Sequence, residues 1–320
     1  MKPLRIGTRG SPLARWQAAA VADAIARHGG PRAELVTIRT SGDRLSRASI
    51  SEAGGKRLFV KEIEDALAAG RIDLAVHSAK DVPAERLSGL SIRAVLPRAD
   101  PHDCIVAPWS SRRAAMDPTS LLSSAPGAAA PRVGTGSVRR AAQLRHAWPD
   151  VDIAPIRGNV GTRLRKLDAG EVDLLVLASA GLARLNLSAR ISAALPFDSC
   201  VPAPGQGILV AEHRADDQLL HDVLATIGDA ESSAALAAER AVVRALGADC
   251  QVPLGAVATL AGGELRLRTV VASTDGSRLV RRDARAPVAE ASRLGAEVAA
   301  ALLDAGAGEL LAAVAAATPS

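Results

Sequence analysis

The feature that most constrains this chain is an approximate internal repeat. The segment 5–8 (RIGT) is echoed at 132–135 (RVGT), and the segment 70–76 (GRIDLAV) is echoed at 170–176 (GEVDLLV). Each segment is a short apolar run beside a glycine, which is typical of a strand next to a tight turn. Because both matches occur in the same order, the sequence predicts two similar α/β units.

The first unit begins with a predicted strand, turn and helix. A strand at 4–8 precedes a helix that Ser11 can cap and Pro12 can begin. The expected apolar face of this helix consists of Leu13, Trp16, Val21, Ala24 and Ile25. We expect further strands at 34–39, 74–77 and 92–96, and a helix at 58–69 that Gly70 ends. The polar, glycine-bearing segment 41–55 predicts a mobile loop.

Two segments rich in Pro, Gly and Asp, at 97–108 and 196–207, bracket the second unit and predict a pair of hinge strands. The strand-like run at 207–212 can then return to the first sheet. After it, a helix at 232–246, strands at 255–259 and 264–272, and alanine-rich helices predict a small α+β domain. The expected bounds are 1–100 with the returning segment 206–226 for domain 1, 105–201 for domain 2, and 229–320 for domain 3.

Composition excludes several classes of protein. With 48% hydrophobic and 23% charged residues the chain should fold, and no apolar run approaches the roughly 20 residues of a membrane span. No signal peptide is visible, so we expect a cytoplasmic protein. Three scattered cysteines, Cys104, Cys200 and Cys250, are too few for a disulfide framework or a tetrahedral metal site. The net charge is +5, but the aromatic content of 2% argues against nucleic acid and favours small anionic ligands.

Arginine and hydroxyl side chains follow several of the predicted strands. Such groups lie at 8–11 (TRGS), 134–140 (GTGSVRR) and 157–163 (RGNVGTR), and Arg184 follows the strand at 174–177. In open α/β sheets, ligands bind outside the carboxyl ends of the strands, and helix N-termini there attract anions. Any one of these arginines could be an ordinary solvated side chain. Together they predict a ligand with several carboxylates, since the guanidinium group pairs with carboxylate through two hydrogen bonds. Neither of the usual glycine-rich nucleotide-binding motifs is present.

The segment 77–83 (HSAKDVP) follows another strand and places Lys80 and Asp81 at the same expected edge. Taken alone, the segment could hold a structural ion pair in a turn. Among so many cations, a single carboxylate is suited to oppose positive charge on a reaction intermediate. We therefore take Asp81 as the candidate catalytic residue.

Five motifs carry a family resemblance. HSAKDVP, GTGSVRR, RGNVGTR, PAPGQG and ADCQVPLG occur in this order, and the similarity runs from RIGTRGSPLARWQ into the third domain. In these motifs the chain resembles the porphobilinogen deaminase family. The resemblance implies two domains like type II periplasmic binding proteins, a double-strand hinge and a small third domain. Departures from the family pattern, namely Arg57, Gly136 and Asp249, remove no reacting group.

The resemblance also implies an activity. Such an enzyme is a transferase of tetrapyrrole (haem and chlorophyll-type) biosynthesis, which condenses four porphobilinogen units head to tail with loss of ammonia and releases hydroxymethylbilane. A dipyrromethane primer would be attached covalently to Cys250 through a thioether, with no metal. The expected protein is a cytoplasmic monomer whose partner is the small molecule porphobilinogen, not nucleic acid or a membrane.

Residue roles follow from the same resemblance. Asp81 would be catalytic. Besides Cys250, the expected cofactor-binding residues are Ser78, Lys80, Asp81, Thr135, Ser137, Arg139, Arg140 and Arg163. The expected substrate-binding residues are Arg9, Ser11, Gln17, Arg157 and Arg184.

One alternative comes from another functional class. A two-domain solute-binding protein for a polycarboxylate ligand would also explain the repeat and the arginines. It would leave the third domain and Cys250 without a role. A covalently bound dipyrrole, which a pyrrole-aldehyde reagent stains, distinguishes the enzyme from the binding protein. A nucleic-acid-binding protein is a weaker alternative, which a linear dependence of log affinity on log salt concentration would support.

Overall fold

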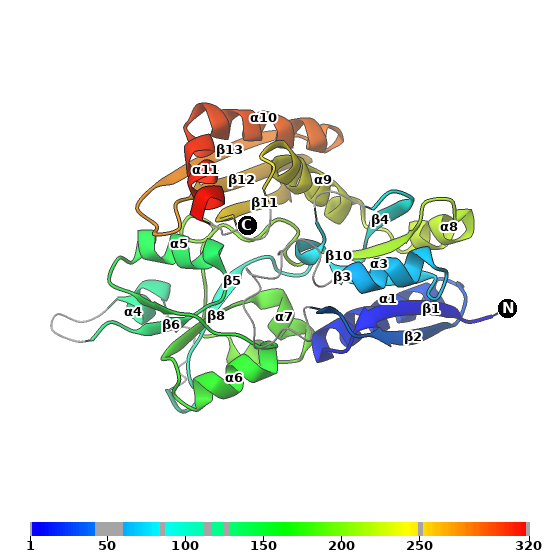
Figure 1. Cartoon of the computed structure of the whole chain (residues 1–320), viewed down its shortest axis with the longest axis horizontal. Helices are drawn as coiled ribbons and strands as arrows, with labels where there is room; N and C mark the ends of the chain where they lie inside the picture. Colours follow the sequence, from blue (N-terminus) through cyan, green and yellow to red (C-terminus); the bar gives the residue numbers. More distant parts are fainter. Residues whose placement is uncertain are drawn as a thin grey trace.

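The computed structural model describes residues 2–41, 60–83, 87–111, 117–123, 129–248 and 252–317. Three sheets organise this part of the chain (Figure 1). Most of the predicted loop at 41–55 lies outside the described residues, as does Cys250.

The first sheet has five strands. It combines four strands from residues 4–95 with one strand from residues 209–214. Its elements are β1 (Leu4–Arg9), α1 (Pro12–Arg27), β2 (Ala33–Ile38), α3 (Lys61–Ala68), β3 (Leu74–Ser78), β4 (Leu90–Val95), β10 (Leu209–Arg214) and α8 (Gln218–Thr226). The strand order is β2-β1-β3-β10-β4. Strands β1, β2 and β3 are parallel, whereas β10 runs antiparallel to both of its neighbours.

The second sheet repeats this plan. Its elements are β5 (Asp103–Val106), α4 (Pro118–Leu122), β6 (Arg132–Gly134), α5 (Val138–Ala147), β7 (Asp152–Ala154), α6 (Val160–Asp168), β8 (Leu174–Ala178), α7 (Ser179–Arg184) and β9 (Ala193–Ala194). The order β7-β6-β8-β5-β9 matches the first sheet, with β5 as the antiparallel strand in the place of β10. The prediction of two similar α/β units is confirmed.

The repeated residues form the same contacts in both units. The backbone N–H of Arg5 donates to the Asp73 carboxylate at 2.9 Å, and that of Arg132 donates to the Asp173 carboxylate at 2.8 Å. The glycine of each RxGT segment is also required by packing. A Cβ at Gly134 would lie 2.8 Å from Leu175, and one at Gly7 would overlap Ile72. The repeat in the sequence is therefore a repeat in the structure.

The hinge segments exchange strands between the units. The chain leaves the first sheet after β4 and enters the second as β5, then leaves the second after β9 and returns as β10 (Figure 1). The prediction of a hinge over 97–108 was therefore too long, because residues 103–106 pair with β8 and β9. Within 103–106 (DCIV) only three consecutive residues are apolar. A pattern this short does not distinguish a strand of the sheet from a hinge segment.

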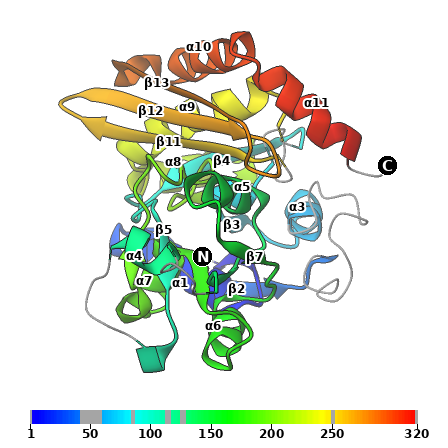
Figure 2. The ribbon, with the colours of Figure 1, turned by 90° about the vertical axis from the view of Figure 1, so that its left-hand side faces the viewer.

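The third sheet is antiparallel and is covered by helices on one face (Figure 2). Its elements are α9 (Ala230–Ala245), β11 (Leu254–Ala261), β12 (Glu264–Ala272), β13 (Leu279–Pro287), α10 (Ala291–Asp304) and α11 (Ala307–Ala317). A continuous apolar core lies between the sheet and the helices α9 and α10. The sequence analysis missed β13, whose polar run is stabilised by cross-strand pairing of Asp283 with Arg266 and Arg268 of β12.

A buried carboxylate joins the third unit to both hinge segments. The Glu239 side chain of α9 is fully buried and accepts hydrogen bonds from Arg98 Nη1 at 2.7 Å and from the backbone N–H of Gly205 at 2.5 Å. It also accepts from the backbone N–H of Ala258 in β11 at 2.7 Å. One side chain thus anchors the first hinge segment, the second hinge segment and the third sheet.

Trp16 was wrongly predicted to lie on the buried face of α1. It is 40% exposed, and the Arg184 guanidinium carbon lies 5.9 Å from its ring centroid. The helical spacing was right, but the ring faces α7 of the other unit rather than the core.

Within the described ranges no single helix has the length and apolarity to cross a bilayer. A pair at Val288–Asp304 and Ala307–Ala316 meets those two criteria together but is bent by 80°.

Candidate active site

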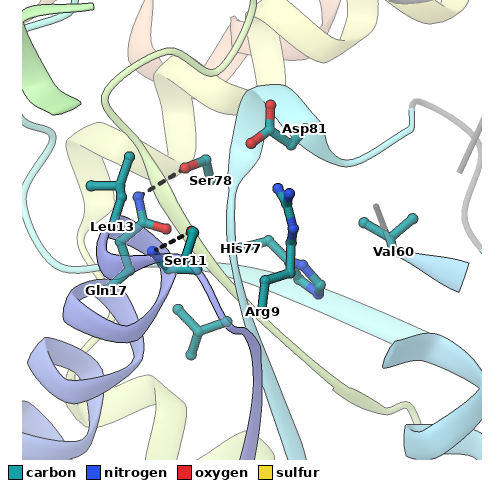
Figure 3. A pocket seen from close by; sticks show the side chains of 10 residues that line it. Arg9, Ser11, Leu13, Gln17, Val60, His77, Ser78 and Asp81 are labelled. Atoms are coloured by element: carbon teal, nitrogen blue, oxygen red, sulfur yellow. Dashed lines mark hydrogen bonds between the residues drawn. The ribbon is translucent and has the colours of Figure 1, made fainter. Parts of the chain in front are cut away.

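A pocket of about 60 Å³ lies where β1 and β3 end. Five of the residues that the sequence predicted for the site line it together, namely Arg9, Ser11, Gln17, Ser78 and Asp81 (Figure 3). Leu13, Ala14, Val60, Val76 and His77 complete the lining. Residues up to 72 positions apart in sequence therefore form one site, because the parallel strands β1 and β3 end at the same edge of the sheet.

The polar side chains of this pocket are held by the turn that follows β1. Ser11 is the N-cap of α1, and its hydroxyl accepts a hydrogen bond from the backbone N–H of Ala14 at 3.2 Å. One turn later, Gln17 is buried and its Nε2 donates to the Ser78 hydroxyl at 2.8 Å. Figure 3 shows the Arg9 side chain extending toward Asp81. A cation and a carboxylate thus share the mouth of the pocket.

Asp81 is exposed at the end of a short 3-10 turn, Ala79–Asp81, directly after β3. The second hinge segment holds this turn, since Ala79 donates its N–H to the Ile208 carbonyl at 3.0 Å. Gly205 has a φ of +77°, and a Cβ there would lie 3.0 Å from the backbone nitrogen of Lys80. Gly205, the first glycine of the PAPGQG motif, is therefore needed for the hinge to approach the turn that carries Asp81.

A buried pair that the sequence analysis missed lies behind this pocket. His77 Nε2 and Glu212 Oε2 are 3.1 Å apart, and both side chains are almost wholly inaccessible. The pair joins β3 to β10, strands that are 135 residues apart at this point. The motif HSAKDVP drew attention to Lys80 and Asp81, and no local pattern indicated that the preceding histidine meets a carboxylate from the returning strand.

A second polar cluster connects the two units. Gln206 accepts a hydrogen bond from Lys80 Nζ at 3.2 Å and donates to Asp103 Oδ1 at 2.9 Å. Arg139 Nη1 lies 2.7 Å from Asp103 Oδ2, and Arg140 Nη2 lies 2.7 Å from Asp103 Oδ1. Asp103 is completely buried. Both adjacent arginines of GTGSVRR therefore form ion pairs with Asp103, the first residue of β5.

Burial and charge shift the pKa values in this second cluster. Burial alone would raise the pKa of Asp103, but the guanidinium groups of Arg139 and Arg140 hold it below its ordinary value. Burial lowers the pKa of Lys80 to about 8, with Arg140 acting in the same direction and Asp81 opposing. Bound anionic groups would reverse the shift of Lys80, because a nearby negative charge favours its protonated form.

Arg139 retains hydrogen-bonding capacity toward a ligand. Its Nη1 donates to Asp103 and to the Val201 carbonyl, at 2.7 and 2.6 Å. Among the described residues, nothing accepts from its Nε or Nη2. Arg140 by contrast uses all three of its nitrogens, on Asp103 and the Val176 carbonyl.

The remaining predicted residues are distributed around the second unit. Ser137 caps α5, Thr135 is buried at the end of β6, and Arg157 is exposed after β7. Burial lowers the pKa of Arg163, and the nearby Arg140 adds to this effect. Arg184 donates to the Gly207 carbonyl of the hinge at 2.7 Å, and burial lowers its pKa to about 10. Thr135, Ser137, Arg157, Arg163 and Arg184 do not line the pocket at Asp81.

The surroundings of the two described cysteines disfavour their thiolate forms. Cys104 and Cys200 are fully buried, and burial raises the pKa of each thiol to about 12. The described chain resumes at Val252, just before β11. The third cysteine, Cys250, falls between the described residues on a connection from α9 to β11.

Comparisons with known proteins agree over nearly the whole chain. Residues 4–222 match the family described as "Porphobilinogen deaminase, dipyromethane cofactor binding domain", and residues 234–304 match "Porphobilinogen deaminase, C-terminal domain". The chain belongs to the porphobilinogen deaminase family. The resemblance given by the five sequence motifs is thereby confirmed.

Relatives named porphobilinogen deaminase match this family member over almost their full length. The one from Acidithiobacillus ferrooxidans is 45% identical over 96% of this chain and 97% of its own. Those from Syntrophotalea carbinolica and Bordetella parapertussis are 46% and 47% identical, each over 97% of this chain and over 96% and 95% of their own. Among solved structures, the BvgS periplasmic VFT2 domain of Bordetella pertussis is 17% identical, over 70% of this chain and 86% of that chain, with a TM-score of 0.42.

Proposed function

We propose that this chain is a working porphobilinogen deaminase in which Asp81 carries the chemistry. The enzyme is a transferase that joins porphobilinogen units head to tail with loss of ammonia, on a dipyrromethane primer, and releases hydroxymethylbilane. The observation that carries the assignment to Asp81 is its exposed carboxylate in one pocket with Arg9 and Ser11. A solute-binding protein for a polycarboxylate is not favoured, because both family models are those of the deaminase.

The second cluster fits an acidic cofactor. Lys80, Arg139, Arg140 and Arg163 are four cations that influence one another electrostatically, whereas Asp81 and Asp103 are the two carboxylates among them. The remaining excess of positive charge, together with the free donors of Arg139, suits the carboxylates of a dipyrromethane. When bound, the dipyrromethane supplies the free pyrrole carbon to which the first porphobilinogen unit is added. We assign Ser78, Thr135 and Ser137 to the same binding site, and Cys250 as the point of covalent attachment.

The first pocket, beside Asp81, indicates which residues bind the incoming substrate. Each porphobilinogen carries two carboxylates, so every added unit brings two negative charges that need cationic partners. We assign Arg9, Ser11 and Gln17 to the incoming substrate, since they line the pocket beside Asp81. Arg157 and Arg184 follow strands β7 and β8 and are assigned to the same role. The hydrogen bond from Arg184 to the hinge would link substrate binding to the position of the second unit.

Asp81 would act on charge rather than as a nucleophile. As the carbon–nitrogen bond of the aminomethyl group breaks, ammonia leaves with the bonding electron pair and the pyrrole ring becomes cationic. A fixed carboxylate nearby stabilises this cation, and such electrostatic stabilisation is the largest contribution in many enzymes. After the new carbon–carbon bond forms, the pyrrole carbon that made the attack must lose its proton to regain aromaticity, and Asp81 can accept that proton.

Several further properties belong to the proposal. We propose domain bounds of 1–100 with 206–226, 105–201 and 229–320, which correspond to the three sheets and their helices except that Asp103 and Cys104 of β5 lie just before the second range. We also propose that the protein acts as a cytoplasmic monomer without nucleic-acid or membrane partners. The three hydrogen bonds of Glu239 hold the three units together within one chain.

The covalent attachment is tested by intact-mass spectrometry of the purified protein. We expect an excess mass equal to two linked pyrrole units, peptide mapping that places it on Cys250, and a positive reaction with a pyrrole-aldehyde reagent. Cys250→Ser should be unmodified and almost inactive, while the matched control Cys200→Ser should remain loaded. An unmodified and fully active wild-type chain would contradict the proposal, as would an adduct on Cys104 or Cys200.

A further inference from the structure

A groove separate from the pocket at Asp81 lies on the edge strand of the first sheet, between α8 and α9. It has a volume of about 420 Å³, within the usual range of small-molecule sites. Strand β4 contributes the 91–94 segment, and β10, α8, α9 and the first turn of α10 contribute the other side chains. The proposed function uses none of these residues.

The side chains around this groove are strongly biased in charge. Three arginines, two histidines and three serines line it, namely Arg93, Arg240, Arg244, His213, His221, Ser91, Ser233 and Ser292. Among the described residues that line it, none is an aspartate or glutamate, and the other members are the apolar residues Ile92, Ala94, Leu236 and Ala237. Cationic side chains gathered beside apolar ones favour an anionic molecule.

Two of the groove's arginines, Arg93 and Arg244, have few partners in the described part of the chain. Arg93 Nη2 lies 3.2 Å from His221 Nε2, so this contact is with an imidazole ring and not with a carboxylate. Arg244 is exposed, and no residue in the described part of the chain accepts a hydrogen bond from it. Two guanidinium groups therefore offer donors to the groove, and guanidinium pairs best with carboxylate or phosphate oxygens.

Arg240 connects the groove to the active-site turn. Its Nη2 donates to the Pro83 carbonyl at 2.6 Å, and its Nη1 donates to the Val82 carbonyl at 3.3 Å. These two residues directly follow Asp81 in the chain. An anion bound in the groove would thus contact a side chain that also holds the end of the segment carrying Asp81.

We propose that this groove is a second ligand site, which binds a small oxyanion with two or more negative charges. The shared chemistry is that of a phosphate compound or a polycarboxylate, both of which the guanidinium groups recognise. Arg93 lies on β4 and Arg244 on α9, so a ligand with more than one anionic oxygen can pair with both guanidinium groups at once. The apolar floor at Ile92 and Leu236 leaves room for a small carbon skeleton.

Isothermal titration calorimetry on the cofactor-loaded enzyme tests the site, with pyrophosphate and citrate as separate probes at constant ionic strength. We expect one of them, or both, to bind once per chain, and Arg244→Gln and Arg93→Gln each to weaken that binding about tenfold or more. Arg71→Gln, which removes an exposed arginine elsewhere, should leave the affinity unchanged. Preference for one probe identifies the ligand class.

Two outcomes would overturn the proposal. One is the absence of saturable binding by either probe when ionic strength is held constant, which would mean that the groove is only a solvated cationic surface. The other is binding that persists unchanged in both Arg244→Gln and Arg93→Gln, which would place the anion elsewhere, for example at the arginines near Asp81. Neither outcome bears on the deaminase activity, which is measured separately by turnover of porphobilinogen.

Discussion

The two α/β units differ in the surroundings of one carboxylate each. In the first unit, Asp81 is exposed and lines a pocket with Arg9 beside strands β1 and β3. In the second unit, Asp103 is buried and pairs with Arg139 and Arg140. The two units share strand order and the hydrogen bonds of their repeated segments. They differ in the partner of the carboxylate. In the first unit the Asp81 carboxylate has no hydrogen-bond or ion-pair partner among the residues that the structure describes, whereas in the second unit Asp103 is paired with two arginines.

This difference shows how one fold can be used twice without duplicating a site. Water solvates an exposed carboxylate, so leaving it without a protein partner costs little free energy. Asp81 can therefore pair with a cation that forms during the reaction. A buried carboxylate must be paired, so Asp103 fixes two arginines and positions the free donors of Arg139. The second unit therefore supplies a rigid cationic surface, and the first supplies the reacting group.

The largest expected effect comes from removing the buried charge. Asp103→Ala leaves two buried guanidinium groups unpaired, so the free energy of unfolding should fall by about 3–5 kcal/mol. Denaturant unfolding monitored by circular dichroism measures this. The matched control is Asp283→Ala, which breaks a half-exposed pair with Arg266 and should cost about 1 kcal/mol or less. Equal losses in the two variants would show that Asp103 is not a structural centre.

A smaller effect is expected at the hinge contact that presents Asp81. Gly205 and Gly170 have nearly the same positive φ, +77° and +79°, but only Gly205 is crowded, by Ala79 and Lys80. Gly170→Ala should therefore cost about 1 kcal/mol of unfolding free energy, from backbone strain alone. Gly205→Ala should cost about 1–3 kcal/mol more, from overpacking, and should lower turnover by displacing the turn. If both variants behave alike, the close approach of hinge and turn is unimportant.

The smallest effect concerns the thiols of the second unit. Burial raises the folded-state pKa of Cys104 and Cys200 to about 12, so about one thiol in 10⁴ is thiolate at pH 8. Alkylation by iodoacetamide should be undetectable at both positions in the folded protein and rise as pH approaches 12. Mass mapping of peptides gives the extent at each cysteine, and the same protein unfolded in guanidinium is the control. Rapid labelling at pH 8 would show that the second unit is not closed.

The sequence allowed prediction of what is local or repeated. The RxGT segments, the cap at Ser11 and the polar groups at strand ends follow from spacing and residue type, so the pocket at Asp81 was largely predictable. Pairings across the fold were not. Asp103 lies in a segment predicted as a hinge strand, and its partners are 36 and 37 positions away. Only the topology, which inserts β5 beside β8, brings them together.

The same reasoning explains the other differences. His77 meets Glu212 because β10 returns to the first sheet, and a returning strand carries no local indication of its register. Trp16 has the spacing of a core residue, but its exposure depends on the position of α7 in the other unit. Strand β13 forms from a polar segment because its charges pair with β12. In each case a contact between distant segments outweighed the local pattern.

The central claim is that the first pocket performs the reaction through Asp81, and single-turnover kinetics of cofactor-loaded Asp81→Ala with porphobilinogen test it most directly. The account predicts a rate lower by roughly 10² to 10³, on the order of 3–4 kcal/mol of transition-state stabilisation, at an unchanged free energy of unfolding. Asp81→Glu, which keeps the charge but displaces it, should be intermediate. A loaded Asp81→Ala enzyme that turns over at a near-normal rate would contradict the account.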